Sequence, residues 1–310
     1  MSGAQATAHL ALQEHARPGP GAASEGTRDG QARTGGTLHA KRVLLVEQAF
    51  IDLPGGPAYG PSEIAEATGL NVTVVYRILQ SGLDTATFVR VPPGRYRLGP
   101  GAAKLGMQAM ASTPGPETSR PLLQRLSRIV DGFAMLTVLS PYSGPRQVCI
   151  DTAPGRWGFD ALGLTATQLM EISTSLRVGA AGRVIAAHLP PPLAKRIIRQ
   201  PPPAGAGPGA LHDPHTFAAS LPRTRRAGYA VGRQEIPGWD AVAAPVLWGD
   251  AVYGAVSVLK PSAMMAKDLA LPVAATRATA ERLTQLLSDS GAATALAPPP
   301  VRIGQQHRHR

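Results

Sequence analysis

The chain has 310 residues, of which 44% are hydrophobic, and a formal net charge of +11. This length predicts two domains, each with enough apolar content for a core, and the one cysteine excludes a disulfide framework and a cysteine-rich zinc site. No apolar run approaches the roughly 18 residues of a membrane span, so we expect a cytoplasmic protein with no membrane partner.

The excess of basic residues suggests a polyanionic partner, but its distribution weakens that inference. Residues 41–106 hold seven Lys or Arg against five Asp or Glu, and residues 107–295 hold 18 against 12. Neither part is strongly basic, so a case for nucleic acid has to come from local pattern.

Both ends of the chain are poor in large apolar residues. We therefore predict disordered tails at residues 1–37 and 291–310. The terminal "HRHR" has the composition of a metal or phosphate site, but a solvated tail is the simpler interpretation.

Between the tails, the first predicted unit starts with "LHAKRVLLVEQAFIDL", a helix that ends at "PGGP". A second, short helix begins at Pro61 and Ser62, where proline, serine and following acidic residues favour a helix start. The apolar residues expected to share one face of the first helix are Leu38, Val43, Leu44, Val46 and Phe50.

The stretch "GPSEIAEATGLNVTVVYRILQ", residues 60–80, has the spacing of a helix-turn-helix. Such a motif needs a small residue where the helices cross, a glycine with positive φ in the turn and an apolar anchor on the second helix. Ala65, Gly69 and Val75 meet these three needs, and the motif predicts binding to DNA.

Two short extended runs follow, "TFVRV" and "RYRLG", joined by "PPG". They predict a hairpin with Arg90, Arg95 and Arg97 near its tip. A basic hairpin beside a recognition helix can contact the phosphate backbone, although arginines can also merely keep a hairpin soluble.

The second unit begins after a helix at "GAAKLGMQAM" and a Pro/Gly break, so residues 100–118 form a predicted linker. A helix ("RPLLQRLSRIV"), two strands ("FAMLTVL" and "RQVCIDTA"), a hairpin around Gly249-Asp250 and a closing helix at 267–289 follow. These elements predict a mixed α/β sheet with helices on one side, interrupted by a long loop at 199–214.

From residue 38 to about 290 the sequence resembles the IclR-family transcriptional regulators. The matching stretches are "SEIAEATGL", "VYRILQ" and "GRYRLGPGAAKLG" in the first unit, and "LRVGAAGRVIAAHLP", "RRAGYAVGRQEIPGWDAVAAPV" and "YGAVSVLKP" in the second. The resemblance implies an α+β protein with a winged helix-turn-helix DNA-binding domain at 38–99, a linker helix, and a GAF-like α/β effector-binding domain at 119–290. It also implies dimers or tetramers on double-stranded operator DNA.

The recognition helix departs from the family pattern. Relatives usually begin it with a basic residue and two hydroxyl residues, whereas this chain has "NVTVVYR", with Val72 and Val74 in place of a charge and a hydroxyl. Fewer base contacts are therefore expected. The candidate DNA-binding residues are Ser62, Asn71, Thr73, Tyr76, Arg77, Arg90, Arg95 and Arg97.

The resemblance also implies a small organic effector, such as a carboxylic acid, bound over the sheet. By position, Gly179 and Ala180 would offer free N–H groups to an anion at a helix N-terminus, and Pro245 and Ser257 would face the same pocket. Leu259 would make that pocket more apolar. Close helix packing explains the glycine equally well.

Three further residues keep two interpretations each. Glu235 either orients the ligand or pairs with a nearby arginine, Arg233 or Arg226. Trp157 is either a pocket lid or a core or interface residue. Cys149, within the apolar "QVCI", is most simply a small buried hydrophobe.

Two other classes of protein stay as alternatives: a GAF-like enzyme and an architectural DNA-binding protein without an effector. "LHDPH", residues 211–215, has metal-binding side chains but no third neighbour of fixed geometry. The sequence has no Gly-rich phosphate loop and no G-x-S-x-G motif. We therefore expect no enzyme, cofactor or metal, and a homodimer formed through the first helix and the linker helix.

Overall fold

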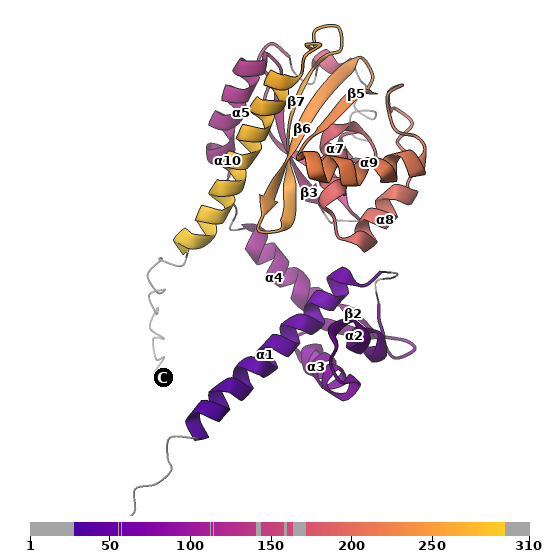
Figure 1. Ribbon diagram of the computed structural model, residues 1–310, viewed down its shortest axis with the longest axis vertical. Coiled ribbons are helices and arrows are strands. Elements are labelled where there is room, and N and C mark those ends of the chain that lie inside the picture. Colours follow the sequence, from indigo (N-terminus) through magenta and orange to yellow (C-terminus); the bar gives the residue numbers. More distant parts are fainter. Residues whose placement is uncertain are drawn as a thin grey trace, which may run out of the picture. The chain divides into compact units, whose positions relative to one another are not determined.

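The computed structural model describes residues 28–54, 56, 58–111, 113, 115–140, 144–157, 160–163 and 172–294 (Figure 1). The chain divides into two units between Leu45 and Val46, within the first helix. The domain boundaries predicted above stay a prediction. None of the helices in the described ranges has the length and apolar content needed to cross a membrane.

Helix α1, Arg28–Asp52, starts ten residues before the predicted helix, inside the predicted tail. Its C-terminal part packs through Val46 and Ala49, which are buried. Leu38 and Leu44 are 50% and 64% exposed, so these two members of the predicted apolar face do not enter the core.

The predicted helix-turn-helix is present as α2, Pro61–Thr68, and α3, Val72–Asp84. Ala65 and Val75 are buried at the crossing. Gly69 ends α2 with φ of 67°, a left-handed conformation that costs glycine little. The turn is therefore built as the sequence predicts.

The predicted hairpin consists of β1, Phe88–Val91, and β2, Arg95–Leu98, paired antiparallel. Phe88 and Tyr96 fill the space between the hairpin and the helices, at 2% and 1% exposure. Tyr96 also accepts a hydrogen bond at 2.6 Å from Gln80 of α3. This contact ties the hairpin to α3.

Helix α4, Pro100–Ala111, is joined closely to the hairpin and to the turn before it. The Gly101 N–H donates to the Ala86 carbonyl at 2.9 Å. A Cβ at Gly101 would lie 2.4 Å from the Thr85 carbonyl oxygen and 2.7 Å from the Thr87 nitrogen, so only glycine fits this approach without movement.

The C-terminal domain is built on a five-stranded sheet of order β4-β3-β7-β6-β5. All four pairings are antiparallel. Gly249, with φ of 63°, turns the predicted β6–β7 hairpin. The strands are β3 Phe133–Ser140, β4 Arg146–Ala153, β5 Ala230–Ile236, β6 Trp239–Trp248 and β7 Ala251–Pro261.

Helices cover both faces of this sheet, so the prediction of helices on one side is wrong (Figure 1). Alternate residues of each strand enter two separate cores, as the two-residue period of a strand requires. The helices α5, Pro116–Val130, and α10, Ala270–Thr294, pack on one face. On the other lie α7 Gly179–His188, α8 Pro191–Arg199 and α9 Pro214–Ala227.

The long loop predicted at residues 199–214 connects α8 to α9. Arg177, with no exposed surface, holds its two ends by donating to the Gln200 carbonyl at 2.7 Å and the Leu211 carbonyl at 3.0 Å. Its guanidinium also lies 3.9 Å from the centre of the Phe217 ring. Burial lowers the pKa of Arg177 from its usual value.

Candidate functional site

A cavity of about 60 Å³ lies between the sheet and α7. On the scale where one water needs ~10–15 Å³, it has room for one small organic molecule. Its wall is mainly apolar. The lining residues are Met135, Thr137, Gln147, Leu162, Ile172, Ser173, Val178, Gly179, Ala180, Ala181, Ile236, Ala241, Ser257 and Leu259.

The N-terminus of α7 faces this cavity, but its first amide is already occupied. The Gly179 N–H donates to the Glu235 carboxylate at 2.8 Å. Glu235 comes from β5, and its side chain is 5% exposed. The prediction that Gly179 offers a free N–H to an anion is therefore wrong, because a carboxylate of the chain itself takes that place.

Glu235 forms an ion pair, but with neither predicted arginine. Its partner is Arg183 of α7, whose side chain is 12% exposed and also donates to the Val231 carbonyl at 3.2 Å. Arg233 instead pairs with Asp240 at 2.6 Å. Burial, together with the charge of Arg223, lowers the pKa of Arg183 to about 10.

The structure places the predicted effector residues unequally. Gly179, Ala180 and Ser257 line the cavity. Glu235 is not among the described lining residues and instead accepts the Gly179 N–H. Pro245 is not among the described lining residues, although β6 places it on the same face of the sheet. Leu259 lines the cavity and adds to its apolar wall, as its position in the sequence predicts.

Sequence reasoning missed three polar lining residues, Thr137, Gln147 and Ser173. In the strand "RQVCIDTA", Gln147 and Cys149 alternate with the exposed Val148 and Ile150. This alternation indicates that Gln147 points inward. It is the feature of the sequence from which Gln147 could have been predicted as a lining residue.

On the helix-turn-helix, the predicted contact residues stand on the open surface of α3. Thr73, Tyr76 and Arg77 are exposed, as is Ser62 at the start of α2. Asn71 is exposed too, but its Oδ1 accepts the Thr73 N–H at 2.8 Å. Asn71 therefore caps α3, and its carbonyl oxygen is already engaged.

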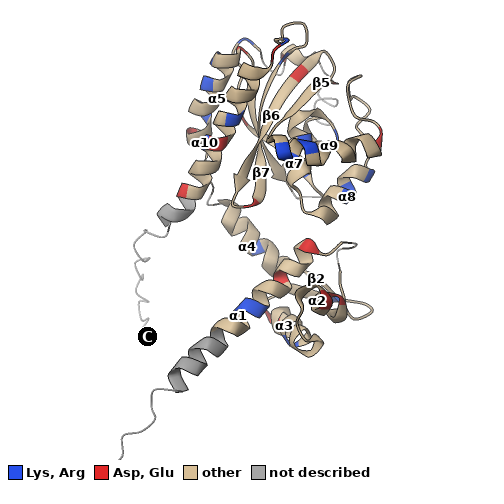
Figure 2. Cartoon of the chain, viewed as in Figure 1, with Lys and Arg blue, Asp and Glu red and all other residues tan. Residues whose placement is uncertain are grey.

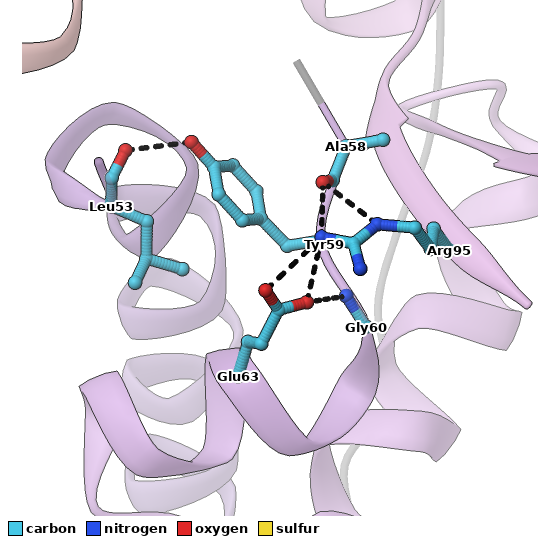
Figure 3. Close-up of polar contacts among 6 residues, drawn as sticks. All are labelled: Leu53, Ala58, Tyr59, Gly60, Glu63 and Arg95. Carbon is cyan, nitrogen blue, oxygen red and sulfur yellow. Dashed lines mark hydrogen bonds and ion pairs between the residues drawn. The ribbon is translucent and has the colours of Figure 1, made fainter. Parts of the chain in front are cut away.

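Arg95 has a structural role that the sequence did not reveal (Figure 3). Its guanidinium donates to the Ala58 carbonyl at 2.9 and 3.1 Å and to Glu63 at 3.0 Å. Glu63 in turn accepts the Gly60 N–H at 2.6 Å, and this bond is the main reason for its lowered pKa. The guanidinium thus holds the segment before α2 against β2, and this structural role competes with the phosphate contact predicted for Arg95.

Arg90 and Arg97 are exposed on the hairpin, and the described contacts of Arg97 amount to one long bond, 3.4 Å, to the Leu98 carbonyl. Positive charge is not confined to this region, because α8 and α9 end in arginines as well (Figure 2). This surface is a candidate for DNA binding because Arg77, Arg90 and Arg97 are exposed on α3 and the hairpin, and not because of its net charge.

The remaining candidates stand away from the cavity wall. Trp157 packs edge to face against Trp239, with ring centres 6.0 Å apart, as a core residue does. Asp213 of the "LHDPH" stretch caps α9 by accepting the Thr216 N–H at 2.8 Å. Within the described ranges no three His, Cys, Asp or Glu side chains converge as metal ligands. Burial raises the pKa of Cys149 to about 11.

Comparison with known proteins gives matches for both the domain and the fold. Residues 170–285 match the family model for the bacterial transcriptional regulator IclR C-terminal domain. The HTH-type transcriptional regulator BhcR of Paracoccus denitrificans (strain Pd 1222) is 28% identical over 173 residues, which are 55% of this chain and 59% of BhcR. The match thus spans about three-fifths of the curated relative.

Two solved structures are similar to this chain. The Thermotoga maritima IclR structure has a TM-score of 0.50 at 18% identity, over 81% of this chain and 99% of that one. An IclR homologue from Microbacterium hydrocarbonoxydans, complexed with 4-hydroxybenzoate, has a TM-score of 0.48 at 20% identity, over 81% and 99%. The Thermotoga structure confirms the predicted fold class.

Proposed function

We propose that this chain, which belongs to the IclR family of transcriptional regulators through its C-terminal domain, binds operator DNA and releases or tightens it in response to a small organic molecule. One observation carries the proposal: a helix-turn-helix with a basic hairpin and a sheet domain with a mainly apolar cavity stand on the same chain. Reading DNA and sensing a ligand require these two parts together.

The proposed DNA surface is the open side of α3 with the hairpin. Thr73, Tyr76 and Arg77 are exposed on α3, which has the dimensions to enter a major groove. Arg90 and Arg97 are free to reach the phosphates on either side. Arg77 is the side chain best suited to a bidentate contact with guanine.

Val72 is 45% exposed at the start of α3 and adds an apolar contact to this surface. Apolar side chains in the major groove contact the methyl group of thymine. Val72 stands where relatives have a charged residue. We therefore expect this chain to prefer half-sites that place a thymine methyl group against Val72 over half-sites that offer only hydrogen-bonding groups there.

A homodimer gives the DNA-binding surface its affinity, because two linked half-sites raise the effective concentration of the second contact. Large apolar side chains are exposed on both helices that the sequence assigns to the interface. Leu44 of α1 is 64% exposed, and Leu105 and Met107 of α4 are 69% and 65% exposed. Such exposure is typical of surfaces that bury on association.

The effector acts in this proposal by binding one conformational state more tightly than another. Its effect on operator affinity is limited to that difference in binding free energy. A compound that binds the cavity and leaves operator affinity unchanged is therefore a ligand but not the effector.

The proposed DNA contacts are tested by selecting duplexes from a random library and footprinting the upstream region of the gene. On the selected duplex, Arg77→Ala is expected to weaken binding by about 1–3 kcal/mol, whereas the matched control Arg282→Ala, exposed on α10, leaves it unchanged. Equal affinity of both variants, or no selected sequence at all, contradicts the proposal.

The oligomeric state is measured separately by light scattering at micromolar concentration. We expect at least twice the 32.2 kDa mass of one chain. A monomer under these conditions contradicts the proposed dimer and leaves the DNA-binding surface to be judged by the first experiment.

A further inference from the structure

The wall of the cavity includes a buried side-chain acceptor whose hydrogen-bonding capacity is unused, the Oε1 of Gln147. Gln147 lies on β4, opposite Leu139 of β3, and is 5% exposed. Within the described part of the chain, its Oε1 has no hydrogen-bond partner. Since Gln147 lines the cavity, this oxygen belongs to the wall of the proposed effector site.

The orientation of this amide is set by its other end. The Nε2 group donates to the Ser175 carbonyl at 2.9 Å. Reversing the amide would place two acceptor oxygens against each other, so the hydrogen-bond pattern assigns the nitrogen to Ser175. Oε1 is therefore an acceptor, and it needs a donor.

The described neighbours in the cavity do not supply that donor. The Thr137 hydroxyl donates to the Ala255 carbonyl at 3.2 Å, and the Gly179 N–H donates to Glu235. Leaving a buried acceptor unpaired costs free energy that a ligand with a hydroxyl or N–H group recovers on binding. A carboxylate ligand would instead bring further acceptor oxygens to Oε1 and a second negative charge toward Glu235.

We propose that Gln147 selects the effector by accepting a hydrogen bond from it, so that the effector is a small, uncharged, mainly apolar molecule with a hydroxyl or N–H donor. The inference rests on the proposed function, since it takes the cavity as the effector site. It replaces the carboxylic acid expected from the sequence, and it gives the apolar wall and the unpaired oxygen one common explanation.

The probes are phenol and fluorobenzene, which have the same number of heavy atoms and differ in the donor. Binding to the full chain is measured by calorimetry and by ligand-observed NMR. In the variant Gln147→Met the phenol-to-fluorobenzene affinity ratio should fall about tenfold, the effect expected for pairing one buried acceptor. The control Gln285→Met, exposed on α10, should keep the wild-type ratio.

A further variant, Ala241→Leu, fills the cavity and should remove the binding of both probes, while aniline should share the behaviour of phenol. Wild-type protein that binds fluorobenzene as tightly as phenol overturns the role of Gln147 without relying on any variant. An unchanged phenol-to-fluorobenzene affinity ratio in Gln147→Met also overturns the role of Gln147, and it is the result expected if a water pairs with Oε1. The cavity then remains the proposed effector site. No saturable binding, or binding that Ala241→Leu leaves intact, overturns the cavity itself and this inference with it.

Discussion

The ion pair between Arg183 of α7 and Glu235 of β5 leads to a stability prediction for the variant Glu235→Gln. Glutamine keeps an acceptor for the Gly179 N–H, so the change removes the negative charge and little else. Arg183, 12% exposed, is then left as a buried cation without its carboxylate. Breaking a buried pair in this way costs about 3–5 kcal/mol, a large share of a domain stability of roughly 5–15 kcal/mol.

The double variant Glu235→Gln/Arg183→Met separates this cause from a general loss of packing. Removing both charges should recover most of the lost free energy, because no unpaired buried ion remains. The exposed pair Arg277–Glu281, 3.7 Å apart, provides the control, and Glu281→Gln should cost less than about 1 kcal/mol.

Urea unfolding followed by tryptophan fluorescence is the suitable assay. The three tryptophans, Trp157, Trp239 and Trp248, all lie in the C-terminal domain, so the signal reports that domain. The reasoning is refuted if Glu235→Gln is within about 1 kcal/mol of wild type, or if the double variant is no more stable than the single one.

Three further predictions concern the caps, the hairpin and the buried thiol. Asn71→Ala should destabilise α3 by about 1 kcal/mol in the same urea assay with a far-ultraviolet signal, whereas Asn71→Asp, which keeps a capping oxygen, should not. Arg97→Ala should lower the salt slope of DNA binding by about one, whereas Arg95→Ala should leave the slope unchanged and lower the melting temperature. The native Cys149 thiol, with its pKa raised to about 11, should react with iodoacetamide with a midpoint near pH 11. Because the unfolded thiol ionises first, near pH 9, its contribution to stability is present below pH 9 and falls as the pH rises toward 11.

Sequence reasoning succeeded where the physical cause is local. The crossing of α2 and α3 depends on Ala65, Gly69 and Val75, which stand within eleven residues, and the structure forms it as predicted. The β6–β7 hairpin likewise follows from the turn at Gly249. In both cases one turn residue and a short apolar period determine the result.

Sequence reasoning failed where a side chain pairs with a residue far away along the chain. Arg95 lies 37 residues from the carbonyl of Ala58 to which it donates, and Glu235 lies 56 residues from Gly179. Patterns of charge indicate that such residues are polar, but they do not indicate which group pairs with which. The coverage of both sheet faces was missed for the same reason, since it depends on how distant helices pack.

The tight approach at Gly101 has a mechanical consequence. Because the backbone at Gly101 lies close to the backbone of Thr85 and Thr87, the start of α4 is held against the proposed DNA-binding domain and moves with it. The 12 residues of α4 make an arm of about 18 Å at 1.5 Å per residue. A rotation of about 10° of this arm about its C-terminal end moves its N-terminal end, where the proposed DNA-binding domain is attached, by about 3 Å, as much as the length of a hydrogen bond. In the proposed complex with DNA, small rotations at the C-terminal end of α4 are thus enough to move α3 out of register with the bases.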